Sequence, residues 1–177
     1  MISLFRFIFI LFYFLVSCSV DYSQKNNLNK VYPSEEIKDF VLNYTDSGRL
    51  VFKIQSPLAV YYENREDFSD FPKGLKLMLY NYDNKVVSTV SSSYARLYDN
   101  NNKVDLSDSV VLINQNNHKL LTEHIVWDIE SEVLSTNENV TIITENEIIH
   151  GEGFVTSNKF KTYQIKNIKG IINIDDE

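Results

Sequence analysis

Apolar and polar residues alternate along much of this chain, which is the pattern of a β-strand with one buried face. In residues 49–56, RLVFKIQS, the side chains of Phe52 and Ile54 fall on one face and that of Lys53 falls on the other. Residues 74–80, GLKLMLY, place leucine at every second position. Both stretches predict strands with an apolar inner face and a solvent-facing outer one.

Turn signals separate these strand-like stretches. The letters DSG at residues 46–48, DN at 83–84 and NN at 116–117 each lie between two apolar-polar runs. Such residues tolerate the left-handed backbone of tight hairpins. No helical period is sustained after residue 42. The chain is therefore predicted to be an antiparallel all-β domain: a sandwich, a jelly roll or an open barrel.

One segment is ambiguous. Residues 33–44, PSEEIKDFVLNY, could begin a short helix with Ser34 as its N-cap, or could enter the first strand. We favour a strand from Asp39 onward, because the segment leads directly into the first predicted hairpin.

The N-terminus carries a short apolar run. Arg6 is followed by ten apolar residues, 7–16. As a helix these rise about 15 Å, against roughly 30 Å for a bilayer core, so they suit the apolar part of a signal peptide better than a membrane span. The run ends in LVSC, residues 15–18, which resembles a bacterial lipobox. We predict that Cys18 is acylated and anchors the mature protein; the alternative is an uncleaved leader with an incidental cysteine.

These features divide the chain. We predict a lipoprotein signal peptide at residues 1–17, a lipidated N-terminus and tether at 18–36, a β-jelly-roll domain at 37–172 and an acidic tail at 173–177.

Composition narrows the function classes. The net charge of −7 argues against a nucleic-acid partner, and one cysteine permits no disulfide framework within the chain. His118, His124 and His150 are scattered without metal-ligand spacing, and no catalytic or phosphate-binding motif is present. We expect no enzyme activity, no cofactor and no metal site.

Four segments carry a resemblance to a known family. In order and spacing, SGRLVFKIQSPLAVYYE, FPKGLKLMLYNYDNKVVSTVSSSYARLYD, HKLLTEHIVWD and IIHGEGF resemble the LptC family of lipopolysaccharide-export proteins, over residues 37–172. The resemblance implies an antiparallel β-jelly roll, open on one side, whose apolar groove shields the acyl chains of lipopolysaccharide. It also implies two protein partners, an inner-membrane ABC transporter and a jelly-roll protein of a periplasmic bridge.

The resemblance has one departure that bears on location. Familiar members carry an N-terminal transmembrane helix, whereas this chain carries the lipobox-like LVSC. We expect a lipid anchor at the periplasmic face of the inner membrane. Ser19 after the cysteine leaves the outer membrane open.

Site residues follow from the alternation and the resemblance together. The groove candidates are apolar residues on one strand face, for which plain core packing is the alternative: Phe52, Ile54, Leu77, Leu79, Leu112, Ile142 and Phe154. The candidates for a partner-docking edge match the family's Gly-x-Gly and the strand after it: Gly151, Gly153, Phe160, Tyr163 and Ile165.

Two other functions compete with this interpretation. A lipid-anchored β-sandwich could serve as a structural or adhesion module without a lipid cargo, and its core would be closed. A lipocalin-like barrel could carry lipid in a cavity closed at the sides. An open apolar groove separates the first interpretation from both.

Overall fold

The computed structural model describes residues 32–63, 68–98, 102–157, 160 and 162–169. The predicted signal peptide, Cys18 and the acidic tail lie outside these residues and stay predictions. Within the described part of the chain, no helix is long and apolar enough to cross a membrane.

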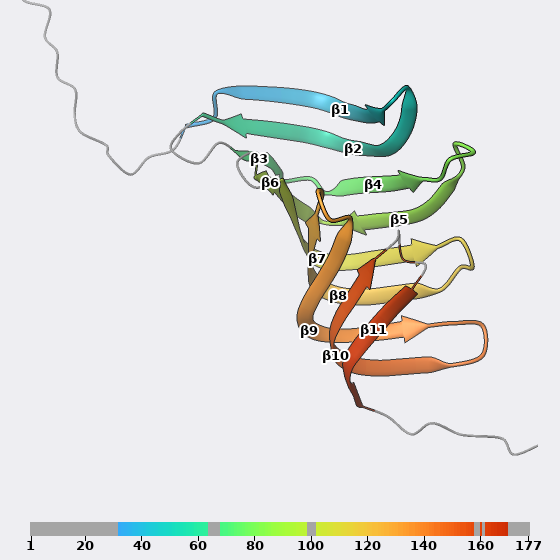
Figure 1. Cartoon of the computed structure of the whole chain (residues 1–177). Coiled ribbons are helices and arrows are strands. Elements are labelled where there is room, and N and C mark those ends of the chain that lie inside the picture. The colour runs from blue at the N-terminus through green and yellow to red at the C-terminus, as the bar shows by residue number, and fades with distance from the viewer. Residues whose placement is uncertain (1–31, 64–67, 99–101, 158–159, 161, 170–177) are drawn as a thin grey trace, which may run out of the picture. The chain divides into compact units, whose positions relative to one another are not determined.

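Antiparallel pairing joins all the described strands into one sheet (Figure 1). The strands are β1 (Glu35–Asp46), β2 (Arg49–Tyr62), β3 (Phe68–Phe71), β4 (Leu75–Tyr80), β5 (Val86–Ser92), β6 (Tyr94–Tyr98), β7 (Lys103–Asn114), β8 (Lys119–Asp128), β9 (Val133–Ile143), β10 (Ile148–Ser157) and β11 (Thr162–Lys169). The sheet order is β11-β10-β9-β8-β7-β5-β4-β2-β3-β6, with β1 beside β2 and β6 also beside β7. The prediction of an antiparallel all-β jelly roll is confirmed.

The predicted hairpin turns are also confirmed. Positive φ angles occur at Ser47 (49°) and Gly48 (77°) between β1 and β2, at Asn84 (56°) between β4 and β5, and at Asn117 (60°) between β7 and β8. These are the residue types that adopt this backbone at low cost, so local chemistry fixes these turns.

The start of the first strand was predicted too late, and the helical alternative was wrong. β1 begins at Glu35, four residues before Asp39, and Glu35 already pairs with Tyr61 of β2. The length of β2 explains the difference, because β1 can continue to pair for as long as its neighbour runs beside it.

Bulges bend the long strands, so that one sheet forms two layers. In β7, Asp108 (φ 62°) and Ser109 (φ 57°) interrupt the pairing with β8 between Ser107 and Val110. The half of β7 before the bulge pairs with β6, and the half after it pairs with β5. β8, β9 and β10 also change register along their length, and Figure 1 shows the bend clearly in β9.

A row of apolar side chains crosses the inner face of one layer. Each member is the cross-strand partner of the next, and each is at most 1% exposed: Ile54, Leu77, Val90, Leu112, Leu120 and Ile142. A shorter row on the other layer consists of Phe71, Ala95, Leu106 and Ile125. Both rows belong to one hydrophobic cluster, so packing between the layers holds the fold together.

An ion pair joins the short strand β3 to β6. Arg96 donates to both carboxylate oxygens of its cross-strand partner Asp70, at 2.6 and 2.9 Å, and the Tyr94 hydroxyl donates to Asp70 at 2.8 Å. Burial, reinforced by the bond to Asp70, raises the pKa of Tyr94 to about 12. The cluster adds side-chain bonds to the backbone pairing of β3, which has only 4 residues.

Substitutions of two adjacent leucines in β8 test how much the inner face contributes to stability. Leu120 is fully buried in the apolar row, whereas Leu121 is 37% exposed on the opposite face. Leu120→Ala should lower the free energy of unfolding by about 2–5 kcal/mol, because it leaves a cavity. Leu121→Ala should cost less than about 1 kcal/mol. Chemical denaturation of both variants checks this; equal losses would contradict the assignment of the inner face.

Candidate functional site

The predicted groove residues all lie in the interior. All seven are buried, between 0% and 5% exposed: Phe52, Ile54, Leu77, Leu79, Leu112, Ile142 and Phe154. Ile54, Leu77, Leu112 and Ile142 belong to the long apolar row, and Phe52 and Leu79 pair with each other one step closer to the β1–β2 turn. Phe154 lies on the half of β10 beyond its bulge. The fold therefore brings these residues onto one continuous inner surface, while their role in binding stays a prediction.

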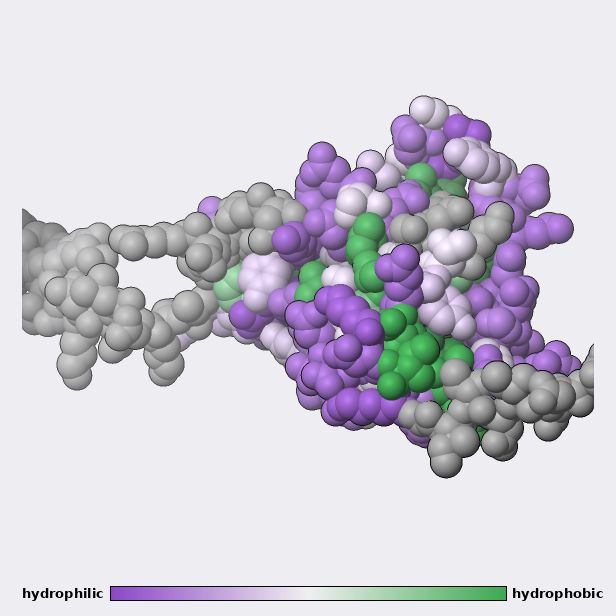
Figure 2. Space-filling view, turned by 60° about the horizontal axis from the view of Figure 1, so that its bottom comes forward, coloured by the Kyte–Doolittle hydropathy of each residue, from purple (hydrophilic) through white to green (hydrophobic). Residues whose placement is uncertain are grey.

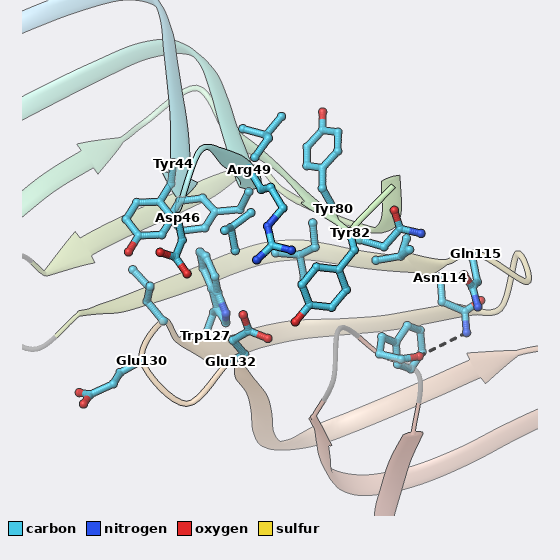
Figure 3. Close-up of a pocket in the computed structure, with 18 of the residues that line it drawn as sticks. Tyr44, Asp46, Arg49, Tyr80, Tyr82, Asn114, Gln115, Trp127, Glu130 and Glu132 are labelled. Atoms are coloured by element: carbon cyan, nitrogen blue, oxygen red, sulfur yellow. Dashed lines mark hydrogen bonds between the residues drawn. The ribbon is translucent and has the colours of Figure 1, made fainter. Parts of the chain in front are cut away.

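A cavity of about 840 Å³ opens beside this surface, where turns of the two layers approach each other (Figure 3). Its apolar floor includes Phe52, Leu79, Trp127 and Phe160. The rings of Phe52 and Trp127 meet edge to face, with centroids 5.0 Å apart. Because Phe52 and Leu79 belong both to the floor and to the inner surface, the cavity is continuous with the predicted groove.

The rim of the cavity is polar. Asp46 and Arg49 come from the β1–β2 turn, Tyr82 from the β4–β5 turn, and Glu130 and Glu132 from the β8–β9 turn. The Arg49 guanidinium carbon lies 4.7 Å from the centroid of the Tyr82 ring. Sequence reasoning missed these residues because they come from three separate turns, and no spacing along the chain links those turns.

The sheet has an edge strand at each end. β11 pairs only with β10, and β1 only with β2, among the described residues. Tyr163 and Ile165 of the predicted docking edge lie on β11, as expected. Gly151 and Gly153 do not lie at the edge, because their strand β10 is paired on both sides.

Phe160 also lies away from any docking surface. It is fully buried, with its ring centroid 5.7 Å from that of Phe154 and 5.4 Å from that of Tyr163. Tyr163 stacks on Phe154 at 5.8 Å, and burial raises the pKa of the Tyr163 hydroxyl. The aromatic side chains of Phe160 and Tyr163 therefore cover this end of the interior. The surface that β11 exposes consists of its unpaired backbone edge and of outward side chains such as Gln164 and Lys166.

The two glycines of β10 have a structural role. Gly153 (φ 79°) lies at the bulge between Glu152 and Phe154, in a backbone region that favours glycine. A Cβ atom on Gly151 would clash with Cγ2 of Ile165 and lie 3.0 Å from the carbonyl oxygen of Asn167. Glycine therefore lets β11 lie close against β10.

No cluster of three or more potential metal ligands occurs within the described residues. His124 Nε2 lies 4.0 Å from Asp105 Oδ1 at the surface, which is an ordinary pair rather than a metal centre.

Comparison with known families completes this picture. Residues 3–173 match the family described as "Lipopolysaccharide-assembly, LptC-related". The chain belongs to this family. The resemblance inferred from its strand segments is thus confirmed. This description connects the family to lipopolysaccharide assembly, so the coarse function of this chain is that of a lipopolysaccharide transport component.

One curated protein shows a weaker similarity. The phenylalanine–tRNA ligase beta subunit of Mycoplasma mycoides subsp. mycoides SC is 28% identical over 170 residues, covering 77% of this chain and 21% of the ligase subunit. The chain thus spans about one fifth of that protein's length. This identity carries no inference about tRNA charging.

A substitution at Gly151 tests the close packing of β11 against β10. Gly151→Ala should destabilise the domain by about 1–3 kcal/mol through overpacking against β11. Amide hydrogen exchange in β11 should accelerate relative to exchange in β4 and β5. Gly48→Ala is the control. A Cβ atom at Gly48 would meet nothing within 4 Å, so this variant should lose stability only through the positive φ of its backbone. Unchanged exchange in β11 of Gly151→Ala would contradict this role.

Proposed function

We propose that this LptC-related protein receives lipopolysaccharide from an inner-membrane ABC transporter and passes it to a periplasmic bridge towards the outer membrane. The observation that carries the proposal is the continuous apolar surface from Ile142 to Phe52, which ends at a cavity with an apolar floor. Acyl chains could lie along this surface once the layers part at the cavity.

Burial of acyl chains supplies the binding energy in this proposal. Each methylene removed from water contributes about 0.8 kcal/mol, which acts against the cost of separating the layers. No nucleotide-binding residues are required in this protein, because the transporter would supply the work.

The two edge strands support docking on both sides. β1 has a net negative set of side chains, Glu35, Glu36, Asp39 and Asp46 against Lys38, whereas β11 has Lys166 and Lys169 and no acid. Exposed edges accept a further strand from a partner. We assign β11 to the jelly-roll protein of the bridge and β1 to the transporter, with the acylated Cys18 holding the domain at the membrane.

In-cell photocrosslinking tests the lipid path. A photoreactive residue at Phe52, Leu79, Ile142 or Phe154 should capture lipopolysaccharide, because these side chains lie along the proposed path. Lys53 and Lys76, which alternate with them on β2 and β4, are the controls and should capture none. Silence at all four interior positions in a folded, anchored protein would support the alternative, a lipid-anchored β-sandwich with a structural or adhesion role.

A second crosslinking series tests the edges. A probe at Gln164 in β11 should capture the jelly-roll protein of the bridge, and a probe at Asn43 in β1 should capture the transporter. Lys119, exposed on the central strand β8, should capture neither because both edges of its strand are paired. Exchanged partners at Gln164 and Asn43 would reverse the proposed direction of assembly.

A further inference from the structure

The mouth of the cavity differs in chemistry from its floor. Phe52, Leu79, Trp127 and Phe160 give the floor an apolar surface, whereas the residues contributed by the turns are almost all polar. On one face of the domain, Figure 2 shows apolar surface among mostly hydrophilic residues. A site built in this way suits an amphiphile, with its alkyl chain on the floor and its head group at the rim.

We propose that this rim binds the polyhydroxylated, sugar part of the amphiphilic cargo and disfavours its phosphate groups. The proposal rests on the proposed function, since it assumes that a lipid chain occupies the floor. It adds the chemical class of the head group and the side chains that recognise it.

Amide side chains give the rim both donors and acceptors. Asn81, Asn102, Gln115 and Asn116 come from three different turns and all line the cavity. Amides can donate and accept at once, which matches a ligand whose hydroxyls do the same. Asn81 contributes mainly its donor, because its Oδ1 already accepts from the backbone N–H groups of Asp83 and Lys85. Tyr82, 82% exposed and backed by Arg49, adds a flat ring at the entrance on which a sugar face can pack (Figure 3).

The charge of the rim argues against phosphate. Among the described residues that line the cavity, three carboxylates, from Asp46, Glu130 and Glu132, stand against the single guanidinium of Arg49. Carboxylates accept hydrogen bonds from sugar hydroxyls and repel phosphate oxygens. The balance of charge therefore selects a neutral head group.

A buried hydroxyl lies beside the cavity, although its residue, Ser88, is not itself one of the residues that line it. Ser88 is 2% exposed, and its Oγ has no hydrogen-bond partner among the described residues. It lies on β5 between its cross-strand partners Leu79 and Asn114, which both line the cavity. Asn114 Nδ2 makes only a long bond, 3.5 Å, to the carbonyl oxygen of Phe160. The linkage between alkyl chain and sugar would supply a polar partner for Ser88 Oγ and a second, closer acceptor for Asn114 Nδ2.

Trp127, the single tryptophan, reports on the floor. Its fluorescence can be titrated with n-dodecyl maltoside and with n-dodecyl phosphate, which share one chain and differ in head group, each below its micelle concentration. We expect the maltoside to bind at least about tenfold more tightly than the phosphate. Repulsion between the rim carboxylates and the phosphate, partly screened by solvent, is large enough to give this difference.

Two variants test which residues cause the preference for the maltoside over the phosphate head group. The double variant Glu130→Gln/Glu132→Gln should tighten binding of dodecyl phosphate several-fold, whereas Glu145→Gln, exposed in the β9–β10 turn, should not. Ser88→Ala should weaken maltoside binding about three- to tenfold while leaving the fold intact, because it deletes one hydrogen bond to the ligand.

The outcomes separate this inference from the proposed function. Equal or tighter binding of dodecyl phosphate by the wild-type protein would overturn the head-group assignment and leave lipid carriage intact. Wild-type affinity of Ser88→Ala for the maltoside would remove Ser88 from the site. No Trp127 response to either amphiphile in the folded protein would contradict the lipid path itself.

Discussion

The bending of the long strands is the constraint on which the rest of this structure depends. Buried backbone groups of a strand must be hydrogen-bonded, so an interior strand that leaves one layer has to find new partners in the other. The bulge at Asp108 and Ser109 allows β7 to pair with β5 on one side of the bend and with β6 on the other. The two layers are therefore halves of one sheet, and their apolar faces must turn towards each other.

Under the proposed function, this geometry gives the interior two tasks that compete. The row from Ile54 to Ile142 stabilises the domain because its side chains are excluded from water. The same side chains are those that an acyl chain would contact, so cargo can enter only by replacing contacts between layers. The cavity at Phe52 and Leu79 is the place where such replacement is least costly, because the packing there is already incomplete.

The two exposed edges of the sheet differ in charge. An unpaired edge invites aggregation, and native proteins commonly limit this with charge. Here β1 is acidic and β11 basic, so two copies cannot pair like edge to like edge without bringing like charges together. Gly151 contributes by letting β11 lie close to β10, which keeps the C-terminal edge in a defined position.

The sequence alone determined the strand content, the hairpins and the inner-facing residues, since these depend on alternation and on turn residues such as Gly48, Asn84 and Asn117. It could not determine which residues lie at an edge. Gly151 was expected there from its match to the family's Gly-x-Gly, but a sheet edge is defined by the absence of a further strand, which is a property of the whole fold. The polar rim was equally out of reach: Arg49, Tyr82 and Glu132 lie in separate turns, and only the bent sheet brings these turns together around one cavity.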